Sequence, residues 1–183
     1  ARTAAAPKRR EINRSNVAQL RVAWTYPVTG TTTFNPIVID EVLYTRGSGN
    51  SLVALNAATG EEIWRHANQG AIGARGLNYW ESADRSDRRL IYLNAGLLTA
   101  VDARTGGTIA SFGDNGRVDL RVALWRDAPN PLQTSNPGRV FDDLFIISLP
   151  AQGAGYQSTP ADVHAYDVRT GAIRWIFHSI PHP

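Results

Sequence analysis

The sequence contains no cysteine, which excludes disulfide bonds and thiolate metal sites. It has no apolar run long enough to span a bilayer and no signal-peptide core, so an exported form is expected to have lost its leader. Glycine-rich phosphate loops between a strand and a helix, serine elbows and carboxylate pairs at a catalytic spacing are absent too. Phosphate-loop sites, serine-hydrolase sites and acid–base catalysis by paired carboxylates are therefore excluded.

Positive charge is in slight excess but is not concentrated. The formal net charge is +3, and apart from Lys8-Arg9-Arg10 the basic residues are dispersed. Because nucleic-acid sites need a basic patch, a solvated surface is the better interpretation. With 183 residues and 43% hydrophobic content, the chain has enough apolar material for a core. We therefore expect a folded, β-rich protein that does not bind nucleic acid.

One eleven-residue unit is written three times. The copies are ALNAATGEEIW at 54–64, AVDARTGGTIA at 100–110 and AYDVRTGAIRW at 165–175. Each has Asn or Asp at its third position and Thr-Gly at its sixth and seventh, and tryptophan closes the first and third copies. Self-similarity of this kind predicts stacked supersecondary units.

The unit has the properties of a β-hairpin. The side-chain oxygens of Asn56, Asp102 and Asp167 can accept from backbone N–H groups two residues on, and glycine supplies the positive φ of a tight reversal. Apolar residues alternate before the turn and resume after it, as in half-buried strands. Trp64 and Trp175 would then lie on one face and seal one sheet against the next. Three unrelated surface hairpins are the alternative, which the common register disfavours.

The pattern predicts an all-β fold, a β-propeller of four-stranded antiparallel blades. The expected strands are 36–39, 41–45, 51–55 and 62–65; then 76–82, 89–93, 98–101 and 108–112; then 133–141, 144–148, 163–166 and 173–178. Before them, Ser15 is expected to cap a helical turn over 16–19, and 20–26 to form a strand around Trp24.

The chain divides into an N-terminal segment with a closing strand (1–34), blades at 35–70, 71–113 and 132–183, and an inserted loop (114–131). The insertion accounts for the longer interval between the second and third copies of the unit. A second irregular stretch, 150–160, is a typical place for binding residues. Three blades do not close a propeller, which needs about four to eight, so we expect a single incomplete domain. The chain is then part of a larger protein or completes itself with other copies through its open edges.

The repeated unit resembles the tryptophan-docking motif of the quinoprotein dehydrogenases, eight-bladed propellers that hold pyrroloquinoline quinone (PQQ) on their axis. The segments that carry the resemblance to the family's amino-terminal third are 12–17, 75–80 (RGLNYW), 111–120 (SFGDNGRVDL) and 167–183. The chain is most similar to the membrane glucose dehydrogenase and pyranose dehydrogenase-like branch. Family sequences continue past the last segment, so Pro183 resembles a cut end.

The resemblance implies a periplasmic or periplasm-facing oxidoreductase. Such an enzyme oxidises a sugar or alcohol with PQQ, aided by Ca²⁺ or Mg²⁺, and passes the electrons to a respiratory acceptor. The family's catalytic aspartate and most of its metal ligands lie in later blades. We therefore expect this chain to hold part of the quinone site, with neither catalytic nor metal-binding residues, and to be inactive alone.

Three residues are the candidates for cofactor binding. Arg75 matches the family arginine that reaches a cofactor carboxylate, and Thr134 with Ser135 falls where the family places a cofactor-contacting threonine. The alternative for Arg75 is an ion pair between blades. For Thr134 it is a hydrogen bond to the local backbone.

Several positions depart from the family pattern. Gln69 and Gly70 stand where some members have adjacent cysteines, and Tyr156 stands where the alcohol dehydrogenase branch has a calcium-binding glutamate. The stretch Ser148-Leu149-Pro150 departs from a Gly-Ser-Arg-like sequence. A metal pair formed by His178 and His182 is disfavoured, because Pro181 prevents a helix from bringing them together.

A competing hypothesis is a non-enzymatic scaffold, because the same docking units occur in propellers that help to assemble outer-membrane proteins. The segment 75–80 discriminates, since a scaffold has no need of a cofactor-facing arginine. Self-association through open edges is a third possibility, and a strict monomer by light scattering would argue against it.

Overall fold

The computed structural model describes residues 12–30, 33–122, 124, 132, 134–151 and 159–179. They form three four-stranded antiparallel sheets in which the strands follow one another in chain order. The first sheet contains β1 (Ile37–Ile39), β2 (Val42–Arg46), β3 (Leu52–Asn56) and β4 (Glu62–His66). The second contains β5 (Asn78–Glu81), β6 (Arg88–Asn94), β7 (Leu97–Asp102) and β8 (Arg117–Asp119). The third contains β9 (Arg139–Phe141), β10 (Leu144–Ser148), β11 (Val163–Asp167) and β12 (Ile173–Phe177).

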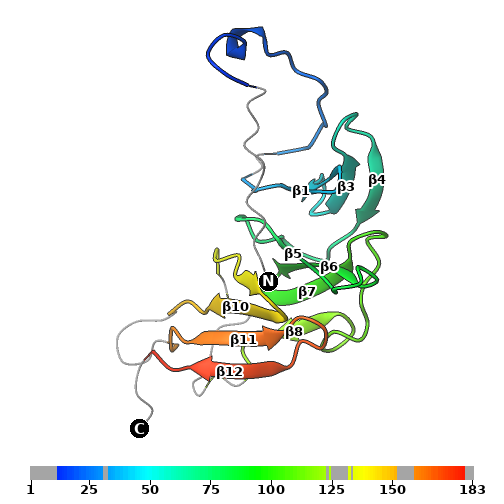
Figure 1. Ribbon diagram of the computed structural model, residues 1–183. Helices are drawn as coiled ribbons and strands as arrows, with labels where there is room; N and C mark the ends of the chain where they lie inside the picture. Colours follow the sequence, from blue (N-terminus) through cyan, green and yellow to red (C-terminus); the bar gives the residue numbers. More distant parts are fainter. Residues whose placement is uncertain are drawn as a thin grey trace.

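The sheets lie side by side like consecutive blades (Figure 1). The all-β class and the partial propeller predicted from the sequence are confirmed. Two hydrophobic clusters lie between the sheets, and the middle sheet contributes to both. Because successive strand residues point to opposite faces, Leu90 and Tyr92 pack toward the first sheet and Ile91 and Leu93 toward the third. This double burial explains the continuous apolar run within β6.

The repeated unit is a hairpin that follows the third strand of each sheet, as predicted; in the first and third sheets it leads directly into the fourth strand. Asn56, Asp102 and Asp167 each accept two backbone N–H groups through one side-chain oxygen, at distances from 2.8 to 3.1 Å. The glycine of each copy has a φ between +72° and +76°. Local chemistry therefore fixes the same turn three times.

Trp64 joins the first sheet to the second, and Trp24 joins the N-terminal segment to the first sheet. The indole Nε1 of Trp64 donates to the carbonyl of Ala103 at 3.1 Å, and Trp24 makes the equivalent bond to Ala57. A Cβ added to Gly106 would lie 2.6 Å from the Trp64 ring, which is too close for any side chain. The glycine of one unit is thus the docking surface for the preceding indole.

The second interface uses different groups, because Ala110 ends the second unit where the first has tryptophan. Phe112 and Val118 cover Gly171, whose added Cβ would lie 3.4 and 2.6 Å from them. The carbonyl of Val168, at the position of Ala57 and Ala103 in the other copies, accepts instead from Arg89.

Arg89 is 6% exposed and forms an ion pair with Asp87 at 2.7 Å. Its Nη1 donates to the carbonyls of Val168 and Arg169 at 3.2 and 2.6 Å. A guanidinium therefore supplies the donor that an indole supplies at the first interface.

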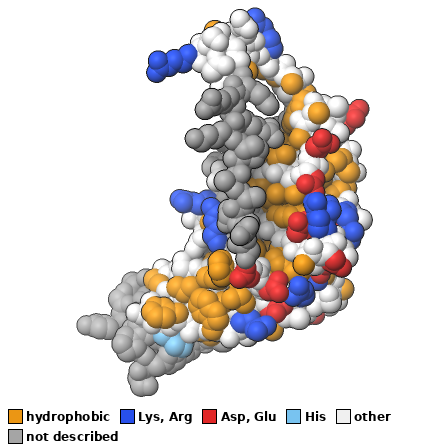
Figure 2. Space-filling model, in the orientation of Figure 1, with side chains coloured by type: hydrophobic (Ala, Val, Ile, Leu, Met, Phe, Trp, Pro, Cys, Tyr) orange, Lys and Arg blue, Asp and Glu red, His pale blue; other side chains and the backbone are white. Residues whose placement is uncertain are grey.

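The third sheet leaves large hydrophobic side chains exposed. Phe141, Trp175 and Phe177 are 65%, 40% and 64% exposed, and Figure 2 shows hydrophobic side chains gathered over this part of the molecule. The sealing role expected of Trp175 is therefore not fulfilled within the described part of the chain.

Some expected elements differ from the structure. The strand expected at 108–112 is reduced to a single bridge from Thr108 to Val101, and the outer strand resumes as β8 inside the segment assigned to the inserted loop. The chain leaves the sheet between these points through a turn in which Gly113, Asn115 and Gly116 have positive φ. The division into blades otherwise stays a prediction.

The segment 20–26 is not a strand, and no described strand pairs with it. The helical turn exists as a 3-10 helix, η1 (Val17–Gln19), but its N-cap is Asn16 and no side chain caps it. Ser15 instead donates to Asn13 at 2.6 Å. The strand expected from 133 is short, since β9 begins at Arg139, and Gln133 itself lies outside the described residues.

Replacement of Gly106 by alanine should lower the free energy of unfolding by about 3 kcal/mol or more, because the methyl group collides with Trp64 and the backbone is left-handed. Gly49→Ala is the matched control, since Gly49 has a φ of +65° and open space around its Cβ position. It should cost about 1 kcal/mol. Chemical denaturation measures both, and equal losses would contradict the docking role.

Arg89→Met removes the donors but keeps much of the side-chain volume, so it should lower the free energy of unfolding by about 1–3 kcal/mol. The control is Arg104→Met, because Arg104 pairs with Asp102 on the surface and is 52% exposed. Denaturation that does not distinguish these two variants would rule out a special role for Arg89.

Candidate functional site

Arg75, Thr134 and Ser135, the three residues predicted from the sequence, line one cavity of about 410 Å³. The other residues that line it are Asn136, Pro137, Ser148, Leu149 and Pro150. The cavity lies where the segment before β5 meets the segment before β9 and the end of β10. It is therefore shared by the second and third sheets.

Arg75 is exposed and belongs to none of the ion pairs among the described residues. The interblade ion pair considered as its alternative is thus not formed with a described acid. Gly76 follows with a φ of +106°, and an added Cβ would lie 2.8 Å from the carbonyl oxygen of Asn35. Glycine lets the chain pass close to the first sheet and leaves the arginine at the cavity.

The segment 134–138 is organised by its own side chains. The backbone N–H of Asn136 donates to Thr134 Oγ1 at 3.0 Å, so the local hydrogen bond considered for Thr134 is present. A hydroxyl that accepts can still donate its hydrogen. Asn136 Nδ2 donates to Ser148 Oγ at 2.8 Å, and Asn136 Oδ1 accepts from the Gly138 backbone. The hydroxyl of Thr134 therefore lies at the rim of the cavity in a defined loop.

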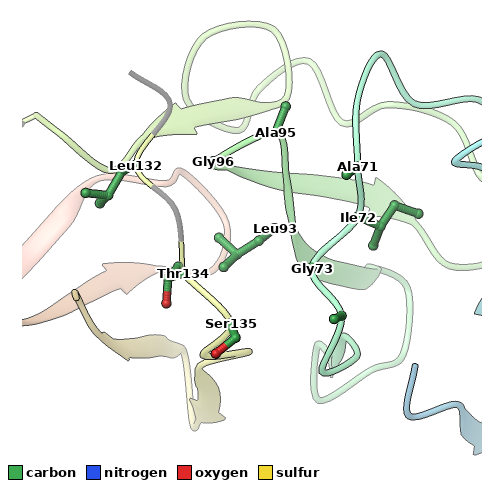
Figure 3. Close-up of a pocket in the computed structure, with 10 residues that line it drawn as sticks. Ala71, Ile72, Gly73, Leu93, Ala95, Gly96, Leu132, Thr134 and Ser135 are labelled. Carbon is green, nitrogen blue, oxygen red and sulfur yellow. The ribbon is translucent and has the colours of Figure 1, made fainter. Parts of the chain in front are cut away.

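A second cavity, of about 310 Å³, shares Thr134 and Ser135 with the first. Its remaining lining residues are small or apolar: Ala71, Ile72, Gly73, Ala74, Leu93, Ala95, Gly96 and Leu132. Figure 3 shows Leu93 between the loop of Ala71 and Gly73 on one side and Thr134 with Ser135 on the other. A polar cavity and an apolar cavity thus meet at the two hydroxyl side chains.

Gln69 and Gly70 stand where some members of the resembled family have cysteines. Each makes a different contact in this chain. Gln69 Oε1 accepts from Arg117 Nη1 at 3.2 Å. Gly70 packs so closely that an added Cβ would lie 2.7 Å from the Cβ of Ala95. Beyond Gly70, the small residues Ala71, Gly73 and Ala74 form one wall of the apolar cavity. Tyr156, the other departure considered, lies outside the described residues.

Sequence reasoning missed the contributions of Asn136 and Ser148 and of the small-residue wall. The run Gly70-Ala71-Ile72-Gly73-Ala74 was a usable signal for that wall, because small side chains permit close approach of a flat ring. In the sequence alone, Ser148 belongs to a stretch that departs from the pattern of the resembled family. The structure nevertheless places Ser148, Leu149 and Pro150 on the cavity lining.

The chemistry of the two cavities suits an anion with a flat apolar body. Arg75 is the cation, hydroxyls and an amide are the neutral polar groups, and no described carboxylate lines either cavity. Within the described ranges, no group of three His, Cys, Asp or Glu residues could hold a metal ion.

The histidines near the end of the chain have structural contacts. His178 Nδ1 lies 3.0 Å from Asp162 Oδ2, which is buried, while His182 lies outside the described residues. His164 is fully buried in β11, with Nδ1 3.1 Å from the Tyr166 hydroxyl and no partner for Nε2. Burial lowers the pKa of His164 below its ordinary value of about 6.5.

This depressed pKa predicts acid sensitivity. The unfolded chain binds a proton at His164 below pH ~6.5 and the folded chain does not, so the free energy of unfolding should fall as the pH decreases from that value toward the folded-state pKa. His164→Gln should reduce this slope in urea denaturation between about pH 7 and pH 5. His66, whose pKa burial also lowers, will contribute part of the remaining slope. An unchanged slope in the variant would contradict the assignment.

No helix in the described part of the chain is long and apolar enough to cross a membrane. The described architecture is that of a β-propeller section with a cavity between two blades, suited to an anionic, ring-containing ligand. Residues 7–183 match the model of the PQQ glucose/ethanol/alcohol dehydrogenase β-propeller domain, and the chain belongs to this family.

Individual relatives agree with this membership. The quinoprotein glucose dehydrogenase of Gluconobacter oxydans is 30% identical over an alignment of 200 positions, which covers 91% of this chain and 25% of that protein. The crystal structure of quinohemoprotein alcohol dehydrogenase from Comamonas testosteroni has a TM-score of 0.67 at 24% identity, covering 94% of this chain and 25% of that one. BamB from Moraxella catarrhalis, at a TM-score of 0.51 and 16% identity over 85% of this chain and 39% of its own, shares the fold. The chain spans about a quarter of the length of the curated relatives it matches.

Proposed function

We propose that this chain forms the first blades of a PQQ-dependent dehydrogenase that oxidises a sugar or an alcohol, and that its two joined cavities hold part of the quinone. The observation that carries the proposal is the convergence of Arg75 from the second sheet with Thr134 and Ser135 from the third on one cavity. Relatives named as glucose and alcohol dehydrogenases support the substrate class.

The residues present fit the cofactor. PQQ is a planar tricarboxylate, which needs a cation for its carboxylates, hydroxyl donors at its rim and an apolar surface against its rings. Arg75 would pair with a carboxylate, Thr134 and Ser135 would donate at the rim, and the small-residue wall at Ala71–Ala74 would face the rings. When bound, PQQ supplies the electron acceptor for oxidation of a hydroxyl group to a carbonyl.

The Ca²⁺ or Mg²⁺ that assists PQQ would be held mainly by other blades, because the described cavity lining offers no carboxylate. Placement in or facing the periplasm and transfer of electrons to a respiratory acceptor follow from the proposed enzyme class. A scaffold that binds no cofactor would have no use for an exposed arginine opposite two hydroxyl side chains.

Arg75→Ala should weaken PQQ binding by the protein encoded by the complete open reading frame. Loss of a charge-assisted hydrogen bond costs about 1.5–3 kcal/mol, or roughly tenfold to hundredfold in Kd. Titration of PQQ in the presence of Ca²⁺ or Mg²⁺, followed by tryptophan fluorescence, measures it. Arg174→Ala, at a 59% exposed arginine of β12, is the control and should bind as the unaltered protein does. Equal affinity in the Arg75 variant would remove Arg75 from the site.

A further inference from the structure

Asn78 is a buried polar side chain that reaches from one sheet to the next. It begins β5, three residues after Arg75, and is 7% exposed. Its Nδ2 donates to the carbonyl oxygen of Pro137 at 2.8 Å. Pro137 belongs to the same cavity lining as Thr134 and Ser135. One amide therefore connects the strand that follows the arginine with the loop that carries the hydroxyl groups.

The hydrogen bond from Asn78 to Pro137 differs from the other hydrogen bonds of the segment 134–138 because it crosses from one sheet to the next. The bonds of Asn136 to Thr134, Ser148 and Gly138 all remain within the third blade. Among the described residues, the bond from Asn78 is the one that ties the segment 134–138 to the second sheet. Without it, the loop loses its hydrogen-bonded tie to Arg75's side of the cavity, so the hydrogen bonds inside the loop should open more often.

The same strand offers an internal comparison. Trp80 lies two residues after Asn78, so both side chains point to the same face of the sheet. The Trp80 indole is 5% exposed and also donates across the interface, to Asp143 Oδ1 at 3.1 Å. Asp143 precedes β10 at the end of the third sheet away from the cavity. The interface thus has two buried donors from one strand, and one of them ends at the cavity.

We propose that Asn78 is a positioning residue for the quinone site, which holds Thr134 and Ser135 opposite Arg75 before the cofactor arrives. The inference rests on the proposed function. Its physical basis is preorganisation: a loop held in place does not have to be ordered on binding, and that ordering would reduce the affinity. Asn78 itself lines neither cavity, so it acts through the loop and not by contact with the ligand.

The test compares Asn78→Leu with Trp80→Phe in the protein encoded by the complete open reading frame. Each variant removes one cross-interface donor and keeps a side chain of similar size. Thermal unfolding of the protein without cofactor should show a loss of stability in both. PQQ titration should show Kd raised about tenfold by Asn78→Leu, corresponding to one lost hydrogen bond, and changed less than about twofold by Trp80→Phe.

The outcomes distinguish the proposed quinone binding from the positioning role of Asn78. If the unaltered protein binds no PQQ, the proposed function is overturned, and this inference with it. If the unaltered protein binds and Asn78→Leu binds equally well, or if both variants weaken binding to the same extent, only the positioning role is overturned. Should Asn78→Leu not fold, Asn78→Ala replaces it. Hydrogen exchange of the Asn136 and Gly138 amides then reports on the loop directly. Exchange should be slower in the unaltered protein than in the variant.

Discussion

The contact on which the structure depends is the docking of an indole ring from one sheet onto the glycine of the next hairpin. The ring covers a backbone that carries no side chain, while its N–H donates to the Ala103 carbonyl, which also accepts from the Tyr44 hydroxyl. Both faces of the middle sheet are apolar, so this sheet cannot bury its residues without its two neighbours.

The second interface meets the same requirement with separate groups. Phe112 and Val118 cover the glycine, and Arg89 satisfies the carbonyl. At the first interface one indole ring provides both the apolar cover and the hydrogen-bond donor. At the second interface two apolar side chains provide the cover and Arg89 provides the donor. The charge of Arg89 is paired with Asp87. The candidate site spans this same interface, so its geometry depends on polar contacts between blades, of which Asn78 to Pro137 is the nearest.

Local chemistry determined how much could be predicted from the sequence. The hairpins follow from Asx-Thr-Gly turns, whose hydrogen bonds all lie within a few residues. The prediction of a strand around Trp24 was wrong, because a strand needs a neighbouring strand to pair with and the described chain provides none there. The predicted position of the outer strand of the second sheet was wrong, because the chain leaves the sheet at residues 110–116 and returns to it as β8. Arg75, Thr134 and Ser135 were accessible only through resemblance, while Asn78 and Ser148 act through partners distant in sequence.

The distribution of ion pairs explains why an anion would be favoured at one end of the blades. At the end with the repeated turns, acids and arginines are matched: Asp40 with Arg85, Asp102 with Arg104, Asp143 with Arg169 and Asp167 with Arg174. At the opposite end, Asp119 is held by Arg121 and Asp162 by His178. Arg75 lies at this end without a described carboxylate beside it. Because no acid in the described part of the chain pairs with the guanidinium there, a ligand carboxylate can pair with it without first displacing one of them.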